Sequence, residues 1–274
     1  MEKIPLPAKI IFEKTSNQNQ IIATIEPFYP GYGTTIGNSL RRIMLSSLTG
    51  AAITGIKIKG IQHEFSTIPN ILEDFIQIVL NLKLVRLKVF TDETVKLILS
   101  AKGEGKVTTK DIKTTSDAEI VNPNQPIATL TAKNAELNME IYAKRGRGFW
   151  PVEERAGEQE VGVIAIDALF TPVRKVGLRI ENVRVGQMTN YEKVVFDIET
   201  DGTIRPEQAL LDSVKILIEQ FNFFVENIKI EEEKKARKGE KAEAETKPKK
   251  TKEKKEKKEK ESSKAQKTKK KAKK

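Results

Sequence analysis

The residues able to do chemistry are few in this sequence, and their spacing does not make a catalytic site. His63 is the only histidine, and it stands between Gln62 and Glu64 at the edge of a predicted strand. An imidazole in that setting is usually a hydrogen-bonded structural group, and a Ser-His-Asp triad would depend on this one residue. The chain has no cysteine, which excludes thiol catalysis, disulfides and cysteine-ligated zinc. We therefore expect no catalytic residue and no metal site.

Two other charged or glycine-rich patterns also favour structural roles. Glu73 and Asp74 are adjacent carboxylates at a predicted helix start, where the helix dipole already favours negative charge. Asn70, with Glu73 three residues later, predicts a capping box at that helix start. Gly103-Glu104-Gly105 is not followed by the Gly-Lys-Ser/Thr sequence of a phosphate-binding loop. The sequence therefore predicts no cofactor and no small-molecule substrate.

The most informative stretch is 28–49, which predicts a helix built for an interface. Pro30, Gly31 and Gly33 form a turn, and Thr34 or Thr35 is the expected N-cap of a helix that ends at Gly50. An apolar stripe recurs at helical spacing, with Ile36, Leu40, Ile43, Met44 and Leu48. Arg41 and Arg42 are adjacent and so lie about 100° apart around the helix. At least one of them must therefore face solvent or a partner.

A second helix with a broad apolar surface is predicted at 206–230, with Pro206 opening it after the turn at Asp201-Gly202. One stripe of this helix comprises Leu210, Val214, Leu217, Phe221, Phe224 and Ile228, and Leu211, Ile218 and Val225 widen it. So broad a surface must be covered from two sides, by the chain's own sheet and by something else.

The rest of the first 230 residues reads mainly as short strands, so the expected fold class is α+β. One further helix is indicated by Leu72, Phe75, Ile76, Val79 and Leu82. Strands are predicted at 8–27 around a turn at 16–19, at 56–59, in a hairpin of 85–90 with 95–99, and at 119–121, 127–131, 137–143, 161–166, 176–185 and 193–200.

The net charge of +11 is confined to the C-terminal end. Residues 231–274 hold 21 basic and 10 acidic residues, whereas the first 230 residues hold 28 of each. The tail has no aromatic residue and no larger aliphatic one, so we expect it to be disordered.

The chain start lacks the apolar run of a signal peptide, and no apolar run reaches the roughly 18 residues that a membrane span needs. With no cysteine in the chain, a cytosolic protein, or one in an equivalent reducing compartment, is expected.

The helix at 28–49 also carries a family resemblance. Gly37-Asn38-Ser39-Leu40-Arg41-Arg42-Ile43-Met44-Leu45-Ser46-Ser47 resembles the signature of the α subunit of bacterial and plastid RNA polymerase. Further matches follow in order, at 63–67, 81–83, 145–148 and 200–204. The resemblance covers about 5–230. It implies a discontinuous dimerisation domain of 1–49 and 173–230, a β-rich insert at 50–172, and a tail at 231–274.

The resemblance also implies partners for particular residues. Arg42, with Arg41 and Leu45, corresponds to the main contact with the β subunit, a task that suits the multi-point fork of a guanidinium. Two copies are expected to pair through both predicted interface helices, with one copy holding β and the other β′. The expected dimer residues are Ile36, Leu40, Ile43, Met44, Leu210, Val214, Leu217 and Phe221; those facing β′ are Val173, Lys175, Arg184 and Lys193.

The motif Arg145-Gly146-Arg147-Gly148-Phe149-Trp150 is open to several interpretations. Arginines beside aromatic residues are typical of nucleic-acid contacts, but a single copy is equally consistent with a loop whose aromatics pack locally. The resemblance favours either a contact with a large subunit or a structural role, and the sequence does not decide between them.

The chain departs from the family after residue 230. A typical α subunit continues into a small helical domain that binds upstream DNA, and here a Lys-rich tail takes its place. Weak binding of DNA through phosphates is expected from its last lysines, which are Lys264, Lys267, Lys269, Lys270, Lys271, Lys273 and Lys274. The alternatives are a free nucleic-acid-binding protein of the chromatin or ribosome class, which would need a basic body, and a stand-alone enzyme, which would need a clustered catalytic set.

Overall fold

The computed structural model describes residues 3–61, 66–155 and 162–228. His63 and the lysines of the tail fall outside these residues, so the expectations for them stay predictions. The chain divides into two compact units, 1–216 and 217–274. The α+β fold class predicted from the sequence is confirmed, because the first unit holds several sheets together with helices.

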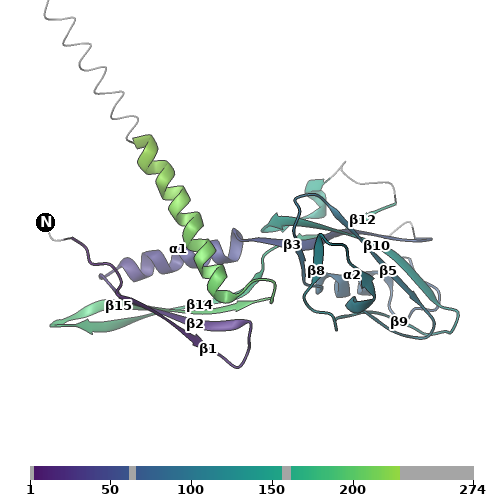
Figure 1. Ribbon diagram of the computed structural model, residues 1–274, viewed down its shortest axis with the longest axis horizontal. Coiled ribbons are helices and arrows are strands. Elements are labelled where there is room, and N and C mark those ends of the chain that lie inside the picture. Colours follow the sequence, from purple (N-terminus) through teal and green to yellow (C-terminus); the bar gives the residue numbers. More distant parts are fainter. Residues whose placement is uncertain (1–2, 62–65, 156–161, 229–274) are drawn as a thin grey trace, which may run out of the picture. The chain divides into compact units, whose positions relative to one another are not determined.

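The first sheet is antiparallel and joins strands from both ends of the first unit (Figure 1). Its order is β1-β2-β15-β14, and α1 lies along one of its faces and contacts β14 and β15. Side chains on the covered face, such as Ala23 of β2 and Phe196 of β15, are fully buried. The bounds are β1 Lys9–Lys14, β2 Gln20–Phe28, α1 Tyr32–Ser46, β14 Val173–Val185 and β15 Met188–Thr200.

Helix α1 begins and ends earlier than the sequence predicted, and its N-terminus is capped from a distant strand. The N-cap is Gly31, with a φ of 85° that favours glycine, and neither Thr34 nor Thr35 caps the helix with its side chain. Instead, the Glu192 carboxylate of β15 accepts from the N–H groups of Gly31 at 2.9 Å and Thr34 at 3.2 Å. A negative group at this end also matches the helix dipole.

Glycine allows α1 to sit close to the sheet. A Cβ added at Gly33 would lie 2.7 Å from Glu192 Oε2 and 2.9 Å from Val194 Cγ2, closer than carbon side chains normally approach. Gly33 therefore lets the first turn of the helix reach the carboxylate that caps it. The placement of α1 depends on this contact between residues about 160 positions apart in the sequence.

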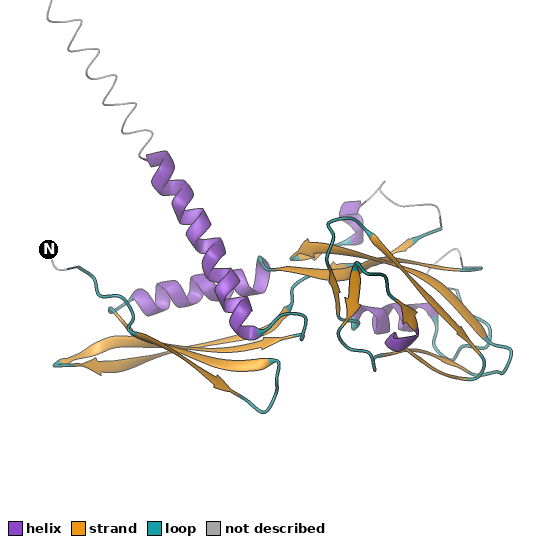
Figure 2. Cartoon of the chain, viewed as in Figure 1, coloured by secondary structure: helices purple, strands orange, loops and turns teal. Residues whose placement is uncertain are grey.

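The strands between α1 and β14 form a second group of sheets, with α2 packed against β3 and β9 (Figure 2). The largest has the order β12-β3-β10-β5-β7, and three two-stranded sheets pair β4 with β8, β6 with β9 and β11 with β13. The bounds are β3 Thr49–Ile58, α2 Phe75–Lys83, β4 Leu87–Val89, β5 Val95–Lys102, β6 Gly105–Thr108, β7 Ile112–Lys113, β8 Ala118–Ile120, β9 Pro126–Leu130, β10 Glu136–Arg147, β11 Phe149–Trp150, β12 Ile164–Ala165 and β13 Ala168–Leu169.

These strands share one core with α2, but two local expectations for this region are wrong. The capping box is formed by Asp74 and Gln77, since Asn70 adopts a φ of 60° and Glu73 accepts from the backbone and hydroxyl of Thr129. The expected hairpin of 85–90 with 95–99 does not form, because β4 pairs with β8 while β5 pairs with β10 and β7. In both cases a distant partner replaces the local one.

The final helix spans 206–228 among the described residues, and Pro206 opens it as predicted. The two sheet groups are consistent with a discontinuous domain and an insert, since β1, β2, β14 and β15 make one sheet and the strands from β3 to β13 make the others. The boundaries at 49, 172 and 230 stay predictions.

The cap on α1 gives a test of how the helix is held. Glu192→Ala leaves two N–H groups at the helix start without their acceptor, so we expect a loss of about 0.5–2 kcal/mol in the free energy of unfolding. Denaturant unfolding at a fixed protein concentration measures it, with Glu13→Ala on exposed β1 as the control. Equal midpoints for both variants would show that Glu192 does not hold the helix.

Candidate assembly interface

The predicted β-subunit contact lies on the open side of α1. Arg41, Arg42 and Leu45 are all exposed, and α1 places Arg42 and Leu45 one turn apart near its C-terminal end. Within the described part of the chain, no carboxylate forms an ion pair with either arginine. Two exposed guanidinium groups beside a leucine can therefore receive carbonyls or carboxylates of another protein.

The predicted dimer residues of α1 do not all face outward. Leu40 and Met44 are buried within one chain, against the sheet, and Ile36 and Ile43 are half-buried. Gly37 is also turned toward the sheet, because a Cβ there would lie 3.1 Å from Leu178. The apolar stripe of α1 is thus largely used inside the chain, and only its border is available to a partner.

The final helix differs, because most of its apolar residues are exposed. Leu210 is buried, Val214 and Leu217 are half-buried, and Phe221 is 61% exposed. Further large apolar side chains are exposed along the same helix, namely Leu211, Ile218, Phe223, Phe224, Val225 and Ile228. An apolar surface of this extent is typical of a site that another protein covers.

The residues expected to face β′ have different surroundings. Val173 is buried, so its side chain is not available on the surface of one chain. Lys175 pairs with Asp197 at 3.4 Å, Lys193 pairs with Glu181 at 2.6 Å, and Arg184 Nε donates to the carbonyl of Gly186. A β′ role for all four residues stays a prediction, although the Val173 side chain is buried within one chain.

In the Arg145–Trp150 motif, the two arginines and Trp150 have partners within the chain, whereas Phe149 is 60% exposed. Arg145 lies 3.7 Å from Asp92, and Arg147 Nε donates to Thr49 Oγ1 at 3.0 Å. A Cβ on Gly146 would be 2.8 Å from the ring of Phe170, so the glycine accommodates that ring. These contacts favour the structural interpretation of the two arginines.

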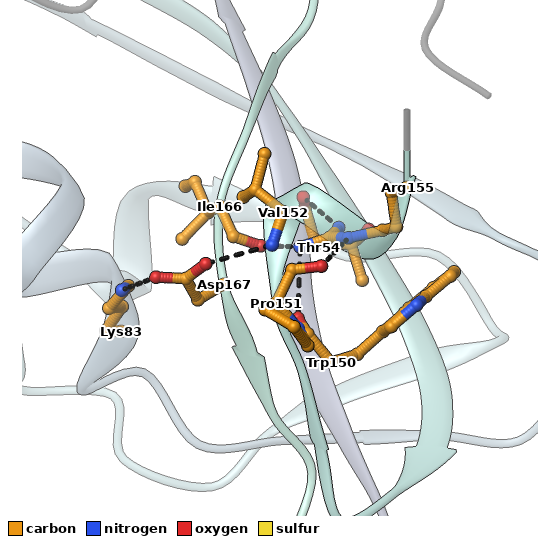
Figure 3. A network of polar contacts seen from close by, with 8 residues as sticks. All are labelled: Thr54, Lys83, Trp150, Pro151, Val152, Arg155, Ile166 and Asp167. Atoms are coloured by element: carbon orange, nitrogen blue, oxygen red, sulfur yellow. Dashed lines mark hydrogen bonds and ion pairs between the residues drawn. The ribbon is translucent and has the colours of Figure 1, made fainter. Parts of the chain in front are cut away.

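Trp150 belongs to a polar network centred on Arg155 (Figure 3). The guanidinium of Arg155, which is 6% exposed, donates to the carbonyls of Thr54, Trp150, Pro151 and Ile166. It also lies 4.8 Å from the centre of the Trp150 ring, and Lys144 Nζ lies 5.3 Å from that ring. One buried side chain thereby ties β3 to the segments that flank β11 and β13.

Asp167 extends the network to α2. Its carboxylate accepts from Val152 N at 3.1 Å and pairs with Lys83 Nζ at 3.1 Å (Figure 3). The Val152 hydrogen bond, and then Lys83, hold the pKa of Asp167 below its usual value. A lowered carboxyl pKa stabilises the fold at neutral pH, and this stabilisation is lost as the pH falls through that pKa.

Sequence reasoning missed Glu192 and Arg155. Both stand among other charged residues in the sequence, where a solvated surface is the ordinary interpretation. Glu192 binds N–H groups about 160 positions away, and Arg155 binds the carbonyl of Thr54, 101 positions away, so no local pattern identifies these contacts.

Other kinds of site find no support in the described residues. No group of histidine, cysteine or acidic residues there is arranged to hold a metal ion. None of the helices in that part of the chain has the length and apolar character needed to cross a membrane.

Comparison with known proteins identifies the family. The model of the RNA polymerase Rpb3/RpoA insert domain matches residues 56–171. The DNA-directed RNA polymerase subunit alpha of Oceanobacillus iheyensis is 48% identical over 218 residues, which cover 77% of this chain and 69% of that protein. The corresponding protein of Aquifex aeolicus is 46% identical over 228 residues, covering 82% of this chain and 71% of that protein. The chain therefore belongs to the family of DNA-directed RNA polymerase α subunits, and its function is that of an α subunit in transcription.

Proposed function

We propose that two copies of this chain pair through the helix at 206–228 and form the platform on which β and β′ assemble. The observation that carries this proposal is the exposed apolar surface of that helix, to which Ile218, Phe221 and Phe224 contribute. Burying such side chains is worth roughly 1.5–3 kcal/mol each, so a second copy gains much by covering them. In a two-fold dimer both chains use the same surface, so the apolar face of this helix on one chain would pack against the same face on the other.

Within this dimer, Arg42 captures the β subunit. Its guanidinium is exposed on α1, and Glu192 and the sheet hold α1 in place. The long side chain therefore extends from a helix fixed at its N-terminus, which lowers the entropy lost on binding. Identical chains then meet different partners, since one copy binds β and the other binds β′.

The chain contributes structure to the polymerase and no catalytic residue of its own. His63 is the one histidine, and the carboxylates Glu73 and Asp74 hold a strand and cap a helix. The Lys-rich tail adds a nonspecific attraction for nucleic-acid phosphates, which reads no sequence.

The dimer surface is tested by Phe221→Asp. An aspartate in the buried interface would lose its hydration and gain no hydrogen-bond or charge partner there. We therefore expect the full-length variant to be monomeric at micromolar concentration. Light scattering gives the mass in solution. The control is Phe90→Asp, which changes an equally exposed phenylalanine outside the final helix and should leave the dimer intact. A wild-type monomer, or an intact Phe221→Asp dimer, contradicts the proposal.

The β contact is tested by Arg42→Ala. The substitution removes an exposed charge and leaves the buried Leu40 and Met44 untouched, so the dimer should persist while β no longer co-purifies with the tagged chain. Arg179→Ala, an exposed arginine on β14, is the matched control and should retain β. Equal recovery of β with both variants would show that Arg42 has no such role.

The tail is tested by deleting 231–274. Residues 262–274 hold seven lysines and no acid, so the full chain should bind DNA weakly and with a steep dependence on salt. Filter binding across a salt series should show that the deletion abolishes this affinity, while dimerisation and β capture persist. Footprinting of the reconstituted polymerase, with and without the tail, tests the same prediction. Sequence-specific protection of upstream DNA that is lost when the tail is deleted would contradict binding through phosphates alone.

A further inference from the structure

A cavity of about 290 Å³ lies between the first sheet and the second group of sheets, both of which belong to the first unit. The start of β3, strand β4, Phe90 and Arg145 line one side of it. The other side is lined by Pro172, Thr203 and Ile204, which adjoin β14 and β15. The chain crosses between the two groups twice, from α1 to β3 and from β13 to β14. This cavity and its lining, called the seam below, have the form of a hinge between two bodies joined by short connections.

A buried ion pair stands beside the seam. Arg86 directly precedes β4 and Asp201 directly follows β15; Arg86 Nε lies 3.9 Å from Asp201 Oδ2, and the two side chains are 18% and 7% exposed. An N–H···O hydrogen bond joins atoms about 2.7–3.2 Å apart, so this contact is not one. Nε is buried and has no hydrogen-bond partner in the part of the chain that the structure describes. Burial lowers the pKa of Arg86, against the opposing effect of Asp201.

Each member of the pair is fixed to its own side of the seam. Asp201 Oδ1 accepts from the N–H of Thr203 at 2.9 Å, and Asp201 N donates to the carbonyl of Pro172 at 2.9 Å. On the other side, Arg86 N donates to Asn122 Oδ1 at 2.7 Å. Because both backbones are held and both side chains are largely buried, the separation of the two charges depends on how far apart the two sides of the seam lie.

A closer approach of the two sides would satisfy this pair. A movement of about 1 Å would bring Nε within hydrogen-bond range of Oδ2. A buried charge that lacks hydrogen bonds is costly, so the new bond would favour the closer arrangement. Apolar residues of the lining, among them Ala51, Val89 and Ile204, would lose contact with water in the same movement.

We propose that the seam closes, and that Arg86 and Asp201 are the latch that holds it closed. In the closed arrangement Arg86 Nε donates to Asp201 Oδ2 and the cavity narrows. The loop after Asp201 leads into Pro206, so closure connects the position of the second group of sheets to the start of the final helix. Two arrangements of one sequence also suit a chain that meets two different partners. That use rests on the proposed function, whereas the closure itself does not.

The test measures a distance across the seam in the full-length chain. The chain has no cysteine, so two introduced cysteines are the only sites for spin labels. Glu13→Cys on β1 and Lys113→Cys on β7 replace exposed residues, one in each group of sheets. Double electron–electron resonance, with an excess of unlabelled chain so that only distances within one chain are seen, should resolve an open and a closed component.

Two substitutions in the latch should remove the closed component. Arg86→Met and Asp201→Asn should each lower the ratio of closed to open by about tenfold or more, as expected when a hydrogen bond between charged groups is lost. Asparagine keeps an oxygen that accepts from Thr203 and removes only the charge. The matched control is Arg179→Met, an exposed arginine on β14 away from the seam, which should leave the ratio unchanged.

Ala51→Leu tests closure without touching the latch. Its larger side chain occupies part of the cavity, so the same component should be lost although Arg86 and Asp201 are intact. Emission from Trp150, the only tryptophan, identifies any variant that fails to fold, and the remaining variants then decide. A single distance component in the wild-type chain overturns the proposal without any substitution in the seam. A ratio that stays the same in the folded latch variants overturns it as well.

Discussion

The proposed assembly depends on one constraint. The helix at 206–228 leaves several large apolar side chains exposed to water. One face of this helix begins inside the chain, at the buried Leu210, whereas Phe221 and Phe224 further along remain exposed. The hydrophobic effect is proportional to the apolar area removed from water, so these residues favour association wherever a complementary surface exists. In the proposed dimer, a second copy of the chain supplies that surface.

Polar contacts serve a different purpose in this chain, which is to fix the positions of the elements that carry exposed side chains. Glu192 holds the start of α1, which carries the exposed Arg42, and Arg155 holds β11 and the segment before β13. Each binds backbone groups through several hydrogen bonds, a geometry that a single long-range ion pair between flexible side chains does not provide. Affinity then comes from groups that are already in place when a partner arrives.

The sequence was sufficient where the determinants are local. The apolar stripe of α1, Pro206 at the last helix and the alternation in β14 and β15 all correspond to elements of the structure. It is insufficient where the partner is distant in the chain. Local pattern predicts Thr34 or Thr35 as the cap of α1, whereas the capping carboxylate is that of Glu192, 158 positions after Thr34. It also predicts a hairpin of 85–90 with 95–99, whereas β4 pairs with β8 and β5 pairs with β10. The stripe also could not show which side the sheet covers, so Leu40 and Met44 were expected at the dimer surface and are buried within one chain.

In the proposed assembly, the species that receives β is a dimer of this chain. Native mass spectrometry of the full-length chain titrated with β measures this most directly, because it counts the copies in each complex. The predicted result is a dimer alone and a complex of two α chains with one β, even when β is in excess, since the second copy serves β′. A complex of one α chain with one β, formed without any α dimer, would contradict the account.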